Sequence, residues 1–540
     1  MRIKYVLICA IVGLGGAALA FAQSVPRPPS PQSGTLRVST RAVQVNVIVQ
    51  DKNGQPVKGL TKKDFTILDH WQPQTVASMW EQTNEVTTST AAASAPNTFS
   101  NRFQQGSDVS PVVSVILLDA LNTPPRDRAS AREQVIKFLK QLQPQDRVVL
   151  YFLSDKIYIA HEFTSDTASL LRALGVFSHL PQDGAGQAPP MDFAPDSPST
   201  GGMAEGASSW AKAGVVADQV FDIEAKVRDT SAALTVIANH LAGVPGRKNL
   251  IWISDSFPFQ INMGSVGQHG AYGPEVFKEA ITKATNALSN ANVAIYPVDA
   301  RGLAAKRPGQ YEIDVRNATI VLAADTGGRS FYDTNDIAGA IQQSIDDSRV
   351  TYVLSYYPSH NQWNGEFREI TVKVNRPGVK VRARAVYFAS PDNVVSAKDK
   401  EEIMVDAAKD SLESTALAMD VQADPVIANG DRHIVARVKI DPSQLRLEKI
   451  GDHWTDSVDV KWVQLADDGQ VLASTSQTLN LNIPQSDYET FFRKAASFSG
   501  SVNLVKGATE VRLVARDSGN GSVGTVNISV DRLFKTDAAK

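Results

Sequence analysis

Four apolar runs in this chain each end on or beside an aspartate, and this pattern constrains the fold more than any other feature. The runs are VVSVILLD, RVVLYFLSD, NLIWISD and VAIYPVD, which place carboxylates at Asp119, Asp155, Asp255 and Asp299. Continuous apolar runs are typical of strands that are buried on both faces of a parallel sheet. Segments with helical periodicity lie between them. This alternation predicts an α/β fold with a doubly wound, Rossmann-like, mostly parallel sheet.

The four aspartates are expected to lie along one edge of that sheet. Ligands of open parallel sheets bind outside the carboxyl ends of the strands, and each aspartate ends a predicted strand. Carboxylates gathered in one place repel each other unless a cation or a basic group lies among them. Oxygen ligands suit a hard cation such as Mg²⁺. The eight histidines show no HExxH or comparable spacing, so we expect no zinc enzyme.

The N-terminus has the pattern of an export signal. Arg2 and Lys4 precede a long apolar stretch, and Ala20 and Ala22 provide the small residues of a cleavage site. We expect cleavage after Ala22, an exported protein in the periplasm or outside the cell, and no stable membrane span thereafter. The alternative is an uncleaved anchor, since the stretch is close to the shortest that spans a bilayer. Cleavage would remove Cys9, the single cysteine, and would exclude disulfides and thiolate chemistry.

Composition argues against nucleic acid as a partner. The net charge is −3 at pH 7, and 43% of the residues are hydrophobic. Proteins that bind nucleic acids present a basic face, which this balance does not predict. The same composition allows a sizeable core, and 540 residues are enough for about three domains.

Changes in pattern along the chain predict the domain organisation. Alternating strands before and after the α/β region are each too short to bury a core alone, so we expect them to pair as one split β domain. Short strands with turn signals near the C-terminus predict a β-sandwich. The expected parts are a signal peptide (1–22), a flexible leader (23–35), an N-terminal β segment (36–83), a linker (84–110), the α/β domain (111–350) with a long insertion (181–216), a second β segment (351–390), a connector (391–412) and the C-terminal β-sandwich (413–534).

The α/β region resembles a von Willebrand factor type A domain, on the segments VILLDALNT, DRVVLYFLSD, RDTSAAL, NLIWISD and VAIYPVD. The resemblance covers about residues 110–350. It implies that a D-x-S-x-S motif, a loop threonine and a later aspartate hold one Mg²⁺ or Mn²⁺, and that an Asp or Glu of a protein partner completes the site. At the matching positions stand Asp119, Thr123, Thr230 and Asp255.

One position departs from that motif. Leu121 stands where the first serine is expected, and leucine offers no oxygen to a cation. The neighbouring Asn122 is expected to point away from the site, as in the usual geometry of the motif. A missing ligand weakens a sparse cation site, so the aspartates have an alternative role as helix caps or as acceptors of loop amides.

A wider stretch is similar to the VWFA-related proteins of acidobacteria. The similarity covers about residues 36–390 and rests on VNVIVQDKNGQPVKGLTKKDFTILD, GVPGRKNLIWISDS and TYVLSYYPSHNQWNGEFREITVKV. It implies a side domain built from the β segments on both sides of the A-type domain. It implies no substrate.

Three functional classes remain open. The first is an adhesion-type module that binds protein at the strand-end edge, through a divalent cation. The second is an envelope scaffold that needs no metal. The third is an envelope hydrolase, which the sequence supports least because it lacks a G-x-S-x-G elbow and a phosphate-binding loop. We therefore expect no enzyme.

Other motifs have simpler interpretations. The DTGG run that starts at Asp325 resembles an aspartic-protease triplet but is more typical of a helix C-cap. Tyr352, Tyr356 and Tyr357 are expected to pack rather than to form a carbohydrate platform. The GRK run at 246–248 is expected to be a solvated turn.

Overall fold

The computed structural model describes most of the chain from Ala42 onward. The described residues are 42–83, 87–88, 97–102, 108–109, 113–143, 146–177, 180, 224–258, 274–301, 310–360, 363–389 and 396–537. All of them belong to one compact unit that begins at Ala42. The expected signal peptide and leader, and the insertion at 181–216, lie outside the described residues.

The α/β part contains a five-stranded, mostly parallel sheet, which confirms the predicted fold class. The strand order is β10-β9-β8-β11-β12, and every neighbouring pair is parallel except β10 with β9. The strands are β8 (Val113–Asp119), β9 (Val148–Leu153), β10 (Ile157–Thr164), β11 (Lys248–Ser254) and β12 (Val293–Asp299). Every residue of β8, β9, β11 and β12 is buried, as expected of central strands covered on both faces.

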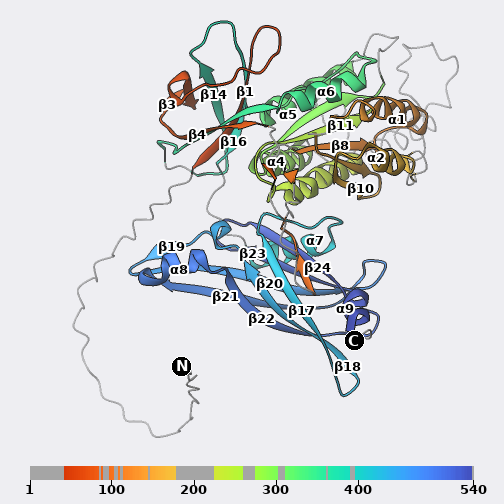
Figure 1. Ribbon diagram of the computed structural model, residues 1–540, viewed down its shortest axis with the longest axis vertical. Helices are drawn as coiled ribbons and strands as arrows, with labels where there is room; N and C mark the ends of the chain where they lie inside the picture. The colour runs from red at the N-terminus through yellow and green to blue at the C-terminus, as the bar shows by residue number, and fades with distance from the viewer. Residues whose placement is uncertain are drawn as a thin grey trace, which may run out of the picture. The chain divides into compact units, whose positions relative to one another are not determined.

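Helices cover both faces of this sheet (Figure 1). One face packs against α1 (Pro125–Leu139), α2 (Thr167–Leu174) and α6 (Ile337–Asp346). The other packs against a helix at 224–241, α4 (Pro274–Asn290) and α5 (Gln310–Thr326). From β8 the chain continues to β9 and β10, on one side of β8. It then returns to β11 and β12, on the other side of β8, so the direction in which strands are added reverses between β8 and β11.

The β segments on either side of the α/β part pair with each other. One sheet has the order β15-β1-β13-β4 and the other the order β16-β14-β2-β3, so each contains strands from both segments. The strands before the α/β part are β1 (Val43–Gln50), β2 (Phe65–Asp69), β3 (Gln72–Gln74) and β4 (Val76–Thr83), with the short helix η1 (Lys62–Asp64). Those after it are β13 (Val350–Tyr356), β14 (Phe367–Val374), β15 (Lys380–Arg382) and β16 (Val386–Phe388).

A buried cluster of polar side chains joins the two segments. Asp69 ends β2 and is buried, and it accepts hydrogen bonds from Tyr356 (3.0 Å) and Tyr387 (2.9 Å). His360 lies 3.4 Å from the same carboxylate oxygen. The carboxylate raises the pKa of both tyrosines, after the larger effect of burial. A single aspartate therefore contacts three side chains that follow it in the chain by 287 to 318 residues.

The C-terminal part consists of two antiparallel sheets around a common core. The first has the order β22-β18-β17-β6, and in the second β20 lies between β21 and β23, with β24 beyond β23. The elements are β6 (Thr98–Ser100), β17 (Met419–Ala428), β18 (Asp431–Ile440), β19 (Glu448–Ile450), β20 (His453–Leu465), β21 (Val471–Pro484), β22 (Ala496–Asn503), β23 (Glu510–Asp517) and β24 (Val523–Ser529).

Short helices and strands complete the structure. Helix α7 (Ala397–Lys409) occupies the expected connector, and α8 (Tyr488–Arg493) joins β21 to β22. The remaining elements are η3 (Pro442–Gln444), η4 (Gln485–Asp487), α9 (Val530–Asp537), β5 (Thr87–Thr88) and β7 (Asp108–Val109). None of the helices in the described ranges is long and apolar enough to cross a bilayer.

Candidate functional site

The candidate site lies where the winding of the α/β sheet reverses. Strands β8 and β11 are parallel neighbours, so their carboxyl ends lie side by side. Asp119 is the last residue of β8, and Asp255 directly follows β11. In doubly wound sheets, such a reversal leaves a crevice in which ligands bind.

Asp119 is fully buried and is surrounded by neutral donors. Its Oδ1 accepts the backbone N–H of Asn122 at 2.9 Å. Its Oδ2 accepts from the Asn122 side-chain amide at 2.8 Å, the Trp252 indole at 2.9 Å and the Ser254 hydroxyl at 3.0 Å. Burial raises the pKa of this carboxyl, and the hydrogen bonds oppose the rise. Both carboxylate oxygens are therefore satisfied by the protein itself.

Asn122 also bridges to the second predicted ligand. Its side-chain nitrogen donates to the Thr230 hydroxyl at 2.9 Å as well as to Asp119. Thr230 lies in the helix at 224–241 and is buried. The expectation that Asn122 points away from the site is wrong. Leu121 packs against the apolar core instead, so the chain turns the amide of the next residue inward.

Thr123 and Asp255 form the other side of the site. The Thr123 hydroxyl accepts the backbone N–H of Asp255 at 3.1 Å. Burial, followed by the charge of Asp127, raises the pKa of the Asp255 carboxyl to about 6. Arg301 partly opposes this rise, with its Nε 3.7 Å from Asp255 Oδ1. The same guanidinium is held by Asp299 at 2.8 Å.

The four strand-end aspartates therefore do not share one environment. Asp119 accepts hydrogen bonds from neutral donors and lies near the charge of Arg128, whereas Asp255 and Asp299 lie on either side of Arg301. Asp155 lies in the hairpin turn between β9 and β10, is exposed, and accepts from the Tyr158 hydroxyl at 2.7 Å. Arg301 therefore lies between two of the carboxylates. A basic group in this position offsets their mutual repulsion, as a cation would.

The residues predicted to hold a cation lie together, but most of their polar atoms are already bound. Asp119, Thr123, Thr230 and Asp255 are linked through Asn122 and one backbone amide. In the described ranges, no group of three or more His, Cys, Asp or Glu side chains is placed to hold a metal ion. An ion at this position would have to displace the Asn122 amide from Asp119. The Mg²⁺ or Mn²⁺ site stays a prediction, and titration can test it.

The structure also shows the environment of the GRK run. Arg247 and Lys248 are buried rather than solvated, because Arg247 donates to the carbonyl oxygen of Gly327 and Lys248 to that of Val244. The expected solvated turn is thus wrong from Arg247 onward. Burial lowers the pKa of Lys248 to about 7.

The expected packing of the aromatic residues is confirmed for two of three tyrosines. Tyr352 and Tyr356 are buried, and only Tyr357 is exposed. The DTGG run ends helix α5, and Gly327 has a φ of +80°. This left-handed residue is the expected glycine C-cap.

Sequence reasoning missed two residues of the site, Trp252 and Arg301, and placed the Asn122 side chain outside it. The sequence could have indicated the role of Asn122, because this amide residue directly follows Leu121, the position where a ligand serine is missing. Arg301 follows Asp299 by two residues, within reach of a carboxylate at the same edge. Trp252 carried no signal, since it lies within a uniformly apolar strand.

No family model matches this chain, and no curated protein matches it. Among solved structures, an aerotolerance-related membrane protein from Bacteroides fragilis aligns at 14% identity, over 44% of this chain and 98% of that one, with a TM-score of 0.24. A von Willebrand factor type A protein from Catenulispora acidiphila aligns at 12% identity, over 84% and 73%, with a TM-score of 0.24.

A third alignment is to the pilus adhesin SpaC from Lactobacillus rhamnosus GG, at 10% identity. It covers 80% of this chain and 57% of that one, with a TM-score of 0.27. These scores are low, so the fold is described from the strand order and the helices on both faces of the sheet. The chain has a mostly parallel α/β sheet with additional antiparallel sheets.

Proposed function

We propose that this chain is an exported protein-binding module, related to the acidobacterial VWFA-related proteins, that binds without a metal ion. The binding surface is the strand-end edge of the α/β sheet. The export signal supports the location, and the resemblance of the sequence supports the family.

The observation that carries the proposal is the position of the Asn122 amide. It lies 2.8 Å from Asp119 and 2.9 Å from Thr230, two of the groups expected to bind a cation. A neutral donor between two oxygens offsets their repulsion without a charge, as a buried hydrogen-bond network requires. Leu121 offers no oxygen that would favour an ion over the amide.

The surface above this network is charged and accessible. We call it the charged rim, and it consists of Arg126, Asp127, Asp155, Asp255 and Arg301. The Arg126 side chain is 82% exposed and that of Arg301 is 34% exposed. The rim carries charges of both signs, which a protein partner with complementary charges would match on binding.

Capture of partners by the full-length chain tests this proposal. The immobilised chain is exposed to an envelope extract of the producing organism, with and without EDTA. We expect the captured proteins to remain in EDTA and to be lost when Arg126→Glu and Asp155→Lys are combined. A control with Glu133→Lys and Lys140→Glu, on the exposed side of α1, keeps the same net charge and should capture normally.

A second candidate is binding through Mg²⁺ or Mn²⁺, favoured by the proximity of Asp119, Thr123, Thr230 and Asp255. If EDTA releases the captured proteins and Mg²⁺ restores them, this candidate replaces the first. If the rim variant captures as well as the control, neither candidate applies to this edge.

A further inference from the structure

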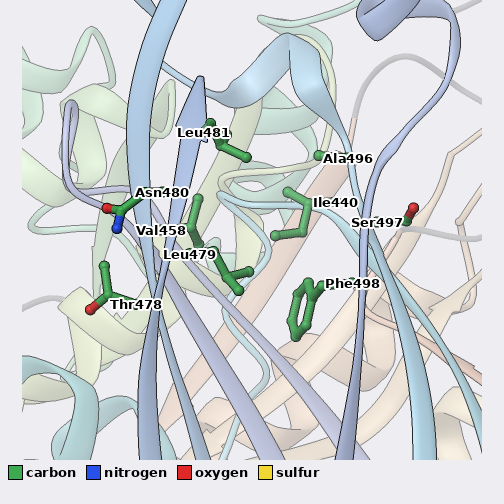
Figure 2. Close-up of a pocket in the computed structure, with 9 residues that line it drawn as sticks. All are labelled: Ile440, Val458, Thr478, Leu479, Asn480, Leu481, Ala496, Ser497 and Phe498. Atoms are coloured by element: carbon green, nitrogen blue, oxygen red, sulfur yellow. The ribbon is translucent and has the colours of Figure 1, made fainter. Parts of the chain in front are cut away.

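A cavity opens at one side of the C-terminal β-sandwich, between β21 and β22 (Figure 2). Its volume is about 470 Å³, within the range of pockets that bind ligands. We call it the edge slot. Its lining includes the core residues Ile440 and Val458, with Leu479 and Leu481 from β21 and Ala496 and Phe498 from β22.

The side chains of β21 alternate about the slot. Leu479 and Leu481 point into it and are half-buried, whereas Thr478 and Asn480 point away and are exposed (Figure 2). The strand thus presents an apolar row to the slot and a polar row to solvent. Further along β22, Gly500 lies against the Trp462 ring of β20, where a Cβ would be 3.2 Å from the nearest ring atom.

Both strands beside the slot are edge strands. β21 pairs only with β20, and β22 pairs only with β18. Apart from the Asn503 carbonyl of β22, which accepts from the Gln464 side chain at 2.9 Å, no hydrogen bond from another described segment reaches the outer backbone groups of these strands. Neither VLASTSQTLNLNIP nor ASFSGSVN contains a charged residue. Natural edge strands are usually protected by charges, so two uncharged edges around an apolar slot are open to strand pairing.

The chain itself covers the opposite side of the same sandwich. Leu417 donates to Val523, and Thr525 donates to Ser414, so the segment at 414–417 pairs with the outer edge of β24. β6 covers the matching edge of β17. Extended segments of polypeptide therefore complete this sandwich where it is closed, and within the described ranges no segment does so at β21 and β22.

We propose that the edge slot binds an extended, uncharged segment of a partner polypeptide. The segment adds to β21 as a further strand, and its alternate apolar side chains lie on Ile440 and Phe498. Main-chain hydrogen bonds supply affinity in this mode, and the slot selects apolar residues at every second position. The two uncharged strands offer no opposite charge to an acidic or basic segment, which favours an uncharged one. This site is separate from the charged rim and does not depend on it.

A blocked octapeptide, Thr-Val-Ser-Val repeated twice, is the probe. Its binding to the full-length chain is measured by fluorescence anisotropy, beside the same peptide with N-methyl groups on alternate residues. N-methylation leaves the apolar side chains unchanged but removes the amide hydrogens along one edge of the peptide. We expect saturable binding that N-methylation weakens by about tenfold or more. Equal binding of the two peptides would overturn strand addition.

Two substitutions on adjacent residues test the location. Leu479→Lys places a charge in the slot and should abolish binding of the peptide. Asn480→Lys places the same charge on the opposite side of β21 and should leave binding unchanged. Far-UV circular dichroism and melting confirm that both variants fold, and if Leu479→Lys does not fold, the N-methylated peptide decides alone.

Other occupants give different results. A second copy of this chain would appear as a dimer by sedimentation velocity that Leu479→Lys dissociates, and that result would overturn the proposal. Competition by octanoate equal to that of the unmethylated peptide would indicate a small apolar ligand and would also overturn it.

Discussion

The Asn122 side chain donates to Asp119 and to Thr230, so one neutral group satisfies two buried oxygens. A cation bound between Asp119 and Thr230 would add a positive charge to the buried site. It would also have to give up part of its hydration shell. The choice between amide and ion depends on Leu121, because a serine there would supply the oxygen that makes an ion competitive. We therefore predict that residues 121 and 122 together decide whether an amide or an ion occupies this position.

Replacing Asn122 by alanine should lower the free energy of unfolding by about 1–3 kcal/mol, because it removes one of the three donors to Asp119 Oδ2 and the donor to the buried Thr230 hydroxyl. Urea unfolding followed by tryptophan fluorescence measures the loss. The control is Asn480→Ala, at an exposed position, which should change stability by less than about 0.5 kcal/mol. A loss below about 1 kcal/mol for Asn122→Ala would show that the network contributes little.

The pH dependence of stability should include a contribution from Asp255. Its pKa in the folded chain is raised from 3.8 to about 6, so the folded state binds a proton more tightly than the unfolded state does. The resulting stabilisation is complete below about pH 4 and is lost as the pH rises through 6. Asp255→Asn should therefore stabilise the protein at pH 8, by roughly 1–3 kcal/mol, and should have little effect at pH 4.

Melting of both proteins between pH 4 and 8 checks this expectation. If Asp255→Asn destabilises the chain at pH 8 in the presence of Mg²⁺ but not in EDTA, the carboxylate is a ligand rather than a source of repulsion.

At the scale of elements, the apolar runs predicted the four parallel strands because burial on both faces leaves little choice of residue. β10 was missed because its side chains are mostly half-buried and follow no clear period. β6 was missed because three residues carry no periodic signal, although Phe99 is buried. The site residues Asp119 and Asp255 followed from the ends of strands. The direction of the Asn122 side chain depends on packing of Leu121, which no local pattern encodes.

The contact between α5 and β12 depends on a glycine. A Cβ at Gly328 would collide with the carbonyl oxygen of Ile295 in the middle of β12. Gly328→Ala should therefore cost about 3 kcal/mol or more, since backbone on both sides would have to move. Gly378 has a φ of +75° and open space around it, so Gly378→Ala should cost only about 1–2 kcal/mol. Equal losses in urea unfolding of the two variants would contradict the close contact.

At the scale of the whole molecule, residues far apart in the chain complete each other's sheets. β1 and β13 are paired across the entire α/β part, and β6 pairs with β17 across more than 300 residues. Asn101 directly follows β6 in the chain. Its side chain donates to the carbonyl oxygens of Ser414 and Leu417 and accepts from the backbone N–H of Met419.

Asn101→Ala should lower the stability of the C-terminal sandwich by about 2–4 kcal/mol, because it removes three hydrogen bonds at a buried position. Hydrogen exchange measured by mass spectrometry should show faster exchange at 414–428 and unchanged exchange in β8 and β11. Uniform acceleration across the chain would contradict a local role for Asn101.

The central claim is that the Asn122 amide, rather than a metal ion, lies between Asp119 and Thr230 at the ends of β8 and β11. Calorimetric titration with Mg²⁺ and Mn²⁺, together with melting, tests it on the wild-type chain, on Asp119→Ala and on the double variant Leu121→Ser with Asn122→Ser. We expect no heat and no shift in Tm for the wild type at millimolar metal, and binding with a raised Tm for the double variant. Saturable binding to the wild type that Asp119→Ala abolishes would contradict the account.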